Sequence, residues 1–449
     1  MMKKIAFILL FLSAFAANAQ EITGKWYGQS HLGVQVLRIN FDIQHTDDGW
    51  AGAMQSPDQS GEWLPFTHIE LRNDTLSMTV ASIGFTYSGK VTGEKLEGSF
   101  SQMGNTFALN LSRQEIVRNR PQEPKPKYPY GIEEVKFRNE QAGIELAGTL
   151  TLPWVGEKPF PAVILVTGSG PQDRDETIQG HRPFWIIADR LTQQGIAVLR
   201  YDDRGVSGSE GDYAAATIDD FAGDAASAIG YLRSHPEIAA GKVGIIGHSE
   251  GGMIALMLAK NRKVDFIVSL AGPGVDGKTL LDMQRTAIMK TGGAPDFYID
   301  AYNNLMNRAV DLVLAIENKK ELRDSITVLF NGTPLENAVE PTIAQLATPE
   351  IRSFLQYDPK EYFPAVHCPV LVLNGEKDLQ VPATPNLEAI RNGLVHNPNV
   401  TVISYPDLNH LFQTAETGLP QEYGVIEETF NREVLQDITD WIQKTVAVF

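Results

Sequence analysis

Apolar and polar residues alternate along the first part of the chain, from residue 20 to about residue 115. This period of two is typical of half-buried strands, whose side chains point to opposite faces of a sheet. Turn-forming clusters such as TDDG at 46–49 and TGE at 92–94 separate the runs. The clearest runs lie at 33–44, 74–80, 84–91, 95–101 and 106–113. The pattern predicts an all-β module, either a barrel or a sandwich, over residues 20–115.

From residue 131 onward the pattern changes, because the apolar runs no longer alternate with polar residues. Strands with both faces covered are apolar throughout. Such runs occupy 161–168, 196–203, 242–247, 265–272, 369–375 and 400–406, and an antiparallel pair is expected at 133–139 and 144–153. Segments with helical spacing lie between the first three runs, at 183–195 and 218–235. The alternation predicts an α/β domain over residues 131–449, with a doubly wound, mostly parallel sheet.

Two stretches interrupt this organisation. Between residues 272 and 369 lie roughly a hundred residues with helical spacing, far more than the dozen that a crossover needs. They predict a helical cap over about 274–365. Residues 116–130 combine charged residues with Pro121, Pro124, Pro126 and Pro129, which is typical of a semi-rigid linker. We therefore expect the two domains to be joined there.

The first residues have the pattern of an export signal. Lys3 and Lys4 precede an apolar stretch at 5–17, and Ala17-Asn18-Ala19 fits a cleavage site. We expect residues 1–19 to be removed before Gln20, giving a periplasmic or secreted protein without a stable membrane anchor. An uncleaved N-terminal anchor is the alternative.

Composition narrows the classes of partner. The formal net charge of −17 disfavours nucleic acid as a partner. Cys368 is the only cysteine, so no disulfide forms within the chain. The motifs of zinc peptidases, P-loops and dinucleotide-binding turns are missing, and we expect neither a cofactor nor a metal. The oligomeric state is left open.

The residues 242–260, KVGIIGHSEGGMIALMLAK, place a serine between a predicted strand and a predicted helix. Gly247-His248-Ser249-Glu250-Gly251 has the G-x-S-x-G pattern, in which glycines permit a turn too tight for side chains. The pattern predicts that Ser249 is a nucleophile. The alternative is a glycine-rich turn with an idle serine.

A serine hydroxyl needs a base, and the base needs an acid that orients it. His410 is the histidine that follows the last predicted strand, and Asp378 lies in the loop after the preceding strand. Asp407 is the rival acid, since it is close to His410 in sequence. Ser249, Asp378 and His410 occur in the order of serine, acid and histidine that α/β-hydrolases use.

Stabilising an oxyanion requires N–H donors. We expect one from the backbone of Glu250, the residue after the nucleophile, and one from Ser169, in the loop after the strand at 161–168. Gly170 is the alternative to Ser169. The charged run Asp173-Arg174-Asp175 is expected to brace this loop by ion pairs.

Residues 131–449 resemble the α/β-hydrolase superfamily and, more narrowly, the EstD-like bacterial carboxylesterases, which join an N-terminal β module to a capped hydrolase domain. The resemblance rests on VTGSGPQDRDE, LRYDDRGVSGSEG, GHSEGG, GEKDLQVP and NHLF. It implies hydrolysis of a small-molecule acyl ester, with Ser249, Asp378 and His410 at the matching positions. Thr167-Gly168 stands where the family often has His-Gly. The alternatives are a peptidase or thioesterase with the same triad, or a lipid- or glycan-binding protein with an inert hydrolase domain.

Overall fold

The structure is a computed structural model, which describes residues 22–448 except 33–34, 48, 60–61 and 103. The expected signal peptide, residues 1–19, lies outside the described residues. The chain divides into two compact units, residues 1–117 and 118–449. Among the described helices, none combines the length and apolar character needed to cross a bilayer.

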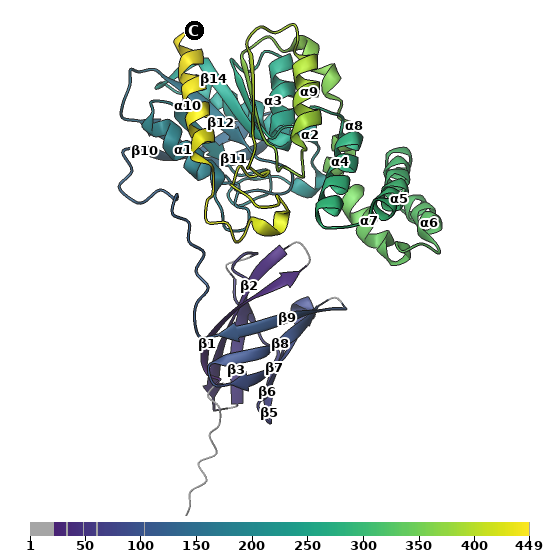
Figure 1. The fold of residues 1–449 in the computed structure, drawn as a ribbon. Coiled ribbons are helices and arrows are strands. Elements are labelled where there is room, and N and C mark those ends of the chain that lie inside the picture. Colours follow the sequence, from purple (N-terminus) through teal and green to yellow (C-terminus); the bar gives the residue numbers. More distant parts are fainter. Residues whose placement is uncertain (1–21, 33–34, 48, 60–61, 103, 449) are drawn as a thin grey trace, which may run out of the picture. The chain divides into compact units, whose positions relative to one another are not determined.

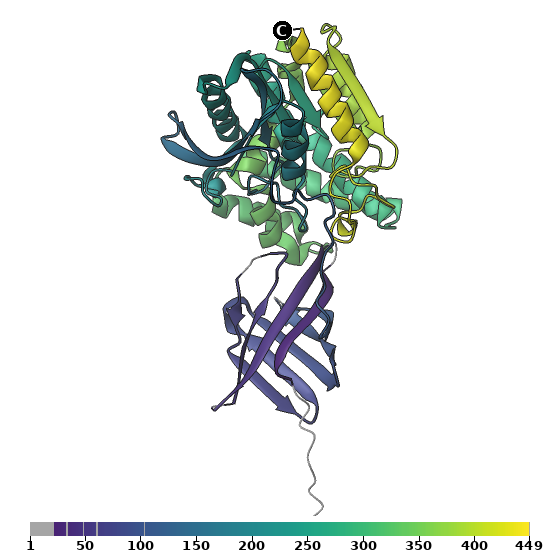
Figure 2. The same cartoon turned by 90° about the vertical axis from the view of Figure 1, so that its left-hand side faces the viewer.

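The first unit is an antiparallel meander that curls around its own core (Figures 1 and 2). Its strands pair in the order β4-β3-β2-β1-β9-β8-β7-β6-β5. They are β1 (Gly24–Leu32), β2 (Gln35–Thr46), β3 (Gly49–Gln55), β4 (Leu64–Pro65), β5 (His68–Arg72), β6 (Thr75–Val80), β7 (Phe85–Thr92), β8 (Lys95–Gln102) and β9 (Asn105–Ser112). The alternation of apolar and polar residues gives the sheet one buried face, as in β7, which buries every second side chain.

Aromatic rings fill the interior of the first unit. The rings of Phe41 and Tyr87 lie 5.2 Å apart, edge to face, and those of Phe85 and Phe100 stack at 5.0 Å. Trp26 is fully buried beside them. Such ring pairs stabilise a core beyond the area that they bury.

The second unit is an eight-stranded sheet with helices on both faces (Figure 1). Its order is β10-β11-β13-β12-β14-β15-β16-β17. The strands are β10 (Tyr130–Asn139), β11 (Ile144–Pro153), β12 (Phe160–Val166), β13 (Ala197–Tyr201), β14 (Ile238–His248), β15 (Ile267–Leu270), β16 (Val370–Gly375) and β17 (Val400–Tyr405). Strands β10, β11 and β13 pair antiparallel, and all later pairs are parallel. The predicted α/β class and mostly parallel sheet are confirmed.

Two apolar layers cover the sheet. Helices α1 (Pro183–Gln193) and α10 (Arg432–Ala447) pack on one face. Helices α2 (Ile218–Ser234), α3 (Glu250–Lys260) and α9 (Ala383–Gly393) pack on the other. Burial on both faces explains why β12, residues 243–247 of β14 and residues 370–373 of β16 are apolar.

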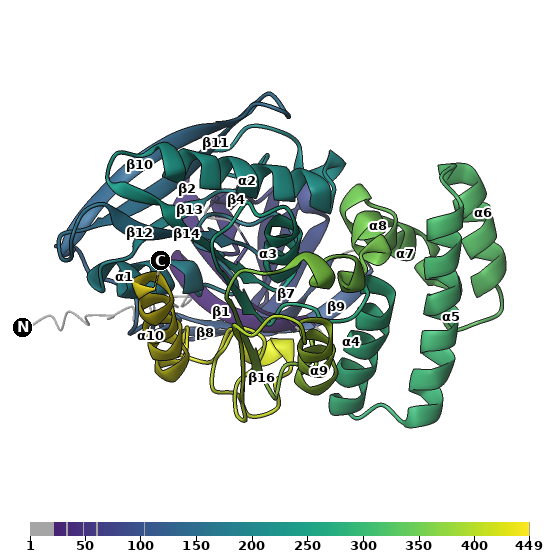
Figure 3. The ribbon, with the colours of Figure 1, turned by 90° about the horizontal axis from the view of Figure 1, so that it is seen from above.

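Five helices between β15 and β16 form the cap, which stands to one side of the sheet (Figure 3). They are α4 (Gly277–Thr291), α5 (Asp296–Ala315), α6 (Lys319–Phe330), α7 (Val339–Leu346) and α8 (Pro349–Gln356). The cap has its own apolar core, which includes Val310, Ile326 and Phe330.

The segment predicted to be a linker is bonded to the second unit over its first residues. Arg120 donates to the carbonyl oxygens of Gly180 and Ile426, and Gln122 Nε2 donates to that of Phe430. Glu123 pairs with Arg182 at 2.7 Å. Charged and polar residues of the segment predicted to be a semi-rigid linker thus form contacts with the second unit.

Candidate active site

Ser249 lies at the turn between β14 and α3. Its φ and ψ of 53° and −116° place a non-glycine residue in a strained region, and such strain is often stored at functional sites. Its N–H donates to the carbonyl oxygen of Leu270 at 2.8 Å, which ties the turn to the adjacent strand β15. The turn therefore has the geometry of a nucleophile elbow.

The glycines of the motif are required by close backbone contacts. A Cβ on Gly247 would lie 2.0 Å from the carbonyl oxygen of Gly251, and a Cβ on Gly251 would lie 2.2 Å from that of Val166. Real Cβ atoms essentially never approach backbone atoms so closely. Residues 247 and 251 therefore cannot carry a side chain, because α3, the elbow and β12 are in close contact there.

His410 and Asp378 lie together in the loops that follow β17 and β16. Nδ1 of His410 is 2.8 Å from Oδ2 of Asp378, and both side chains are buried. Oδ1 of Asp378 accepts the N–H groups of Gln380 and Val381, each at 2.8 Å. The carboxylate is thereby held in one orientation, and it presents Oδ2 to the imidazole.

Asp407 lies elsewhere. Its Oδ1 is 3.1 Å from Nζ of Lys377, and its side chain is 71% exposed. Of the two acids considered from the sequence, the structure thus places Asp378 against His410.

The expected oxyanion donors come from two elements. Glu250 is the first residue of α3, so its N–H lacks a partner one turn earlier within the helix. Ser169 lies in the loop after β12, between two N–H groups that are already bonded. Gly168 donates to Oε1 of Glu176 at 2.8 Å, and Gly170 donates to Oε1 of Glu350 at 3.0 Å. The N–H of Gly170, the alternative donor, is thus engaged, and Ser169 stays the expected donor.

Ion pairs brace the loop after β12, as its charge pattern predicted. Arg174 pairs with Asp202 at 2.7 Å and with Glu134 at 2.6 Å. Asp175 pairs with Arg200, which is buried in β13.

Sequence reasoning missed two interactions at this site. Glu176, from the loop after β12, bonds to Nδ1 of His248 at 2.8 Å. Glu350, from cap helix α8, accepts the Tyr213 hydroxyl at 2.7 Å as well as the N–H of Gly170. Glu176 ends the motif VTGSGPQDRDE and Glu350 lies in α8, but neither position in the sequence indicates which distant group the carboxylate bonds.

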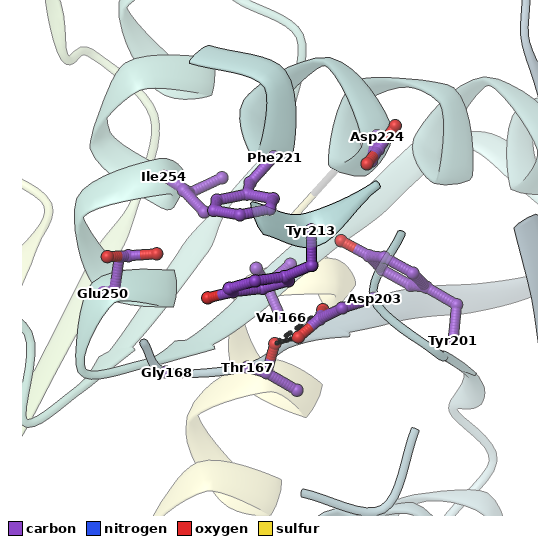
Figure 4. Close-up of a pocket in the computed structure, with 10 residues that line it drawn as sticks. All are labelled: Val166, Thr167, Gly168, Tyr201, Asp203, Tyr213, Phe221, Asp224, Glu250 and Ile254. Carbon is purple, nitrogen blue, oxygen red and sulfur yellow. Dashed lines mark hydrogen bonds between the residues drawn. The ribbon is translucent and has the colours of Figure 1, made fainter. Parts of the chain in front are cut away.

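A small cavity beside the elbow collects acidic side chains (Figure 4). Asp203 accepts the Thr167 hydroxyl at 2.9 Å, and burial raises the pKa of Asp203 to about 8. Burial, followed by the charges of Glu350 and Asp203, raises the pKa of Glu250 well above its usual value. Oε2 of Glu250 is buried and has no hydrogen-bond partner within the described part of the chain. Burial thus favours the uncharged form of Asp203 and Glu250.

Metal ligation was also considered. Within the described ranges, no group of three or more His, Cys, Asp or Glu side chains is arranged to hold a metal ion.

Comparison with known proteins gives esterases and a peptidase that is itself described as uncharacterised. The chain is 28% identical over 301 residues to the esterase EstD of Thermotoga maritima. The aligned region covers 67% of this chain and 66% of EstD, so the chain spans just under two thirds of that relative. It is 25% identical over 269 residues to the peptidase YtmA of Bacillus subtilis, covering 58% of this chain and 77% of YtmA.

Solved structures with a similar arrangement are distant. The esterase Pf2001 of Pyrococcus furiosus aligns over 74% of this chain and 98% of its own, with 17% identity and a TM-score of 0.46. Est1E of Butyrivibrio proteoclasticus, solved with ferulic acid, aligns over 70% of this chain and 99% of its own, with 15% identity and a TM-score of 0.42.

A family assignment covers more than half of the chain. The family described as X-Pro dipeptidyl-peptidase (S15 family) matches residues 142–392, a range that includes Ser249 and Asp378. The strand order and the strained serine after β14 are those of an α/β-hydrolase. The chain therefore belongs to the S15 family and is an EstD-like α/β-hydrolase.

Proposed function

We propose that this protein is a serine hydrolase that cleaves small carboxylic acyl esters through a triad of Ser249, His410 and Asp378. The bond between Asp378 and His410 is the observation that carries the proposal. It is buried, it engages Nδ1, and it leaves Nε2 as the nitrogen available to the serine. The relatives described as esterases support the ester as substrate class.

The reaction follows from the roles of these groups. Nε2 of His410 accepts the proton of the Ser249 hydroxyl while Oγ bonds to the acyl carbon. The N–H groups of Glu250 and Ser169 hold the oxyanion that develops on the carbonyl oxygen. Collapse breaks the ester bond, and His410 returns the proton to the leaving alcohol. Water, deprotonated by His410, then releases the acid from the acyl-enzyme.

A peptidase is the second candidate, and the S15 match favours it. The same groups cleave an amide if His410 protonates a leaving amine. A thioesterase would use the same steps on a thioester. A binding protein with an inert hydrolase domain is the alternative from another class.

A panel of substrates separates these candidates. We would measure kcat/KM for p-nitrophenyl esters of increasing acyl length and for a dipeptidyl X-Pro p-nitroanilide, with Ser249→Ala as the control. We expect ester hydrolysis that the substitution abolishes. Turnover of the anilide without turnover of esters would assign a peptidase. Failure of a fluorophosphonate probe to label Ser249 would favour the binding protein.

We also propose that the protein is exported and cleaved before Gln20, on the pattern of residues 1–19. Sequencing the N-terminus of protein secreted by an expressing cell tests this. A mature chain that starts at Met1 would contradict it.

A further inference from the structure

Three segments that are distant in the sequence meet at one buried pair, Glu176 and His248. The side chains of these two residues are 1% and 6% exposed. Oε1 of Glu176 accepts the N–H of Gly168 at 2.8 Å and bonds to Nδ1 of His248 at 2.8 Å. Nε2 of His248 donates to the carbonyl oxygen of His410 at 2.9 Å. The pair thus touches the loop after β12, the elbow and the segment that carries His410.

Hydrogen bonding determines where the protons of the pair lie. Nε2 of His248 must carry one proton, because a backbone carbonyl only accepts. A second proton lies between Nδ1 and Glu176. Burial by itself would lower the pKa of His248, but the charge and the hydrogen bond of Glu176 outweigh burial, and the pKa is raised. Both ring nitrogens are therefore engaged in hydrogen bonds, and the raised pKa favours the charged form of the ring.

Each contact of the pair lies beside a residue of the proposed reaction. Gly168 precedes Ser169, His248 precedes Ser249, and the carbonyl belongs to His410 itself. A Cβ on Gly168 would lie 3.2 Å from Cβ of Ser249 and 3.5 Å from Oε1 of Glu176, so a side chain at residue 168 would require a neighbour to shift. The rings of His248 and His410 lie 4.7 Å apart.

We propose that Glu176 and His248 are positioning residues, which hold the oxyanion loop, the nucleophile and the base in register for the reaction. This inference rests on the proposed function. Their proposed role requires no contact with the substrate. They act because a misplacement of reacting groups by about 1 Å is enough to slow a reaction about a hundredfold.

Glu176→Gln tests the inference because glutamine has nearly the same shape as glutamate but carries no negative charge. In the native site one oxygen accepts from both Gly168 and His248. If a glutamine oxygen takes that place and the His248 ring stays charged, the ring has no counter-charge. If the ring becomes neutral instead, either Nδ1 or Nε2 loses its proton, and at least one of the three hydrogen bonds is lost.

His181 supplies a matched control. It is also fully buried, and its ring nitrogens bond to the hydroxyl of Thr429 at 2.8 Å and to the carbonyl oxygen of Tyr423 at 2.7 Å. His181→Gln therefore disturbs a buried histidine whose own hydrogen bonds run to Thr429 and Tyr423 rather than to Gly168, Ser249 or His410.

The rate at which a fluorophosphonate labels Ser249 reports the reaction without knowledge of the natural substrate. We would measure this rate, the KM and kcat for p-nitrophenyl acetate, and the urea unfolding midpoint. The proteins are the wild type, Glu176→Gln, His248→Gln, the double variant and His181→Gln.

We expect labelling and kcat to fall about 10- to 100-fold in both single variants, with KM within threefold. His181→Gln should label within threefold of the wild type. The double variant should be no slower than the slower single variant, since both break one network.

Labelling within threefold of the wild type in Glu176→Gln and His248→Gln would overturn the inference. So would an equal loss in His181→Gln, or losses that multiply in the double variant. If Glu176→Gln does not fold, the comparison of His248→Gln with His181→Gln decides by the same criteria. A wild-type protein that takes no label at Ser249 would instead reject the proposed function, and the positioning role with it.

Discussion

Nδ1 of His410 lies 2.8 Å from Oδ2 of Asp378, while Oδ1 of the same carboxylate takes two backbone N–H groups of its own loop. The hydrogen bonds of its own loop therefore orient the carboxylate of Asp378 independently of its bond to His410. Because Nδ1 donates to a carboxylate, the neutral imidazole keeps its lone pair on Nε2.

Asp378→Asn should lower kcat for p-nitrophenyl acetate by about 10⁴-fold. An amide that turns its NH₂ toward Nδ1 selects the tautomer with the proton on Nε2, which then cannot accept the serine proton. Stopped-flow or steady-state hydrolysis measures this.

Asp407→Asn is the control, because Asp407 is exposed and pairs with Lys377. We expect activity within about twofold of the wild type, in line with the small contribution of exposed ion pairs. Equal losses in the two variants would reject Asp378 as the orienting acid.

Gly247→Ala should destabilise the fold by about 3 kcal/mol, because the new Cβ would lie 2.0 Å from a backbone oxygen that cannot move aside. Urea denaturation followed by circular dichroism measures the free energy of unfolding. Gly230→Ala provides the comparison. Gly230 is exposed on α2 with no atom within 4 Å of the added Cβ, so helix propensity should stabilise the variant by about 0.5–1 kcal/mol. Similar effects at both positions would contradict the packing argument.

Glu350→Ala should weaken the attachment of cap helix α8 to the loop that carries Ser169. It leaves the N–H of Gly170 and the hydroxyl of Tyr213 without their acceptor. Loss of a partner by a buried donor destabilises by about 1–3 kcal/mol. We expect a fall of this size in the free energy of unfolding and about a tenfold fall in kcat.

Tyr213→Phe removes only one of these two bonds, so its effects on stability and on kcat should be smaller than those of Glu350→Ala. Unfolding and hydrolysis assays on both variants measure these differences in stability and kcat. Unchanged kcat in Glu350→Ala would show that the loop keeps its position without the cap contact.

Asp203 should make the fold less stable as the pH rises. Burial raises its pKa to about 8, against about 3.9 in an unfolded chain. Between these values the folded protein binds a proton that the unfolded chain has lost. The free energy of unfolding therefore falls with rising pH, by up to about 1.4 kcal/mol per pH unit, and the contribution is fully present only below about pH 4. Burial shifts the pKa of Glu250, in the same cavity, in the same direction.

Asp203→Asn should flatten this dependence, because the amide has no proton to lose. Urea unfolding of both proteins at intervals from pH 5 to pH 9 measures the two slopes. Parallel slopes would mean that Asp203 is ionised in the folded protein across this range.

Much of the architecture could be predicted because it depends on local patterns. The run 242–247 lies within β14, and the Ala/Leu/Met-rich residues after Ser249 form α3. The cap expected over about 274–365 contains the helices from Gly277 to Gln356. Each of these follows from the periodicity of the segment itself.

The choice of partners could not be predicted in the same way. Asp378 and Asp407 both lie near a strand end and both fit the order of serine, acid and histidine, so the sequence favoured Asp378 only by its place in the loop after the preceding strand. The structure separates them, because β16 and β17 are adjacent and the loop after β16 turns Asp378 inward. Asp407 faces solvent instead, beside Lys377.

The sequence by itself determined the tight turn at Ser249, since only glycine fits at Gly247 and Gly251, and it determined which segments become strands and helices. Tertiary structure alone decided that Glu176 meets His248 and that Glu350 reaches Gly170. Hydrophobic periodicity reports only which face of an element is buried. A hydrogen bond between distant segments depends on where whole elements pack, and no local pattern records that position.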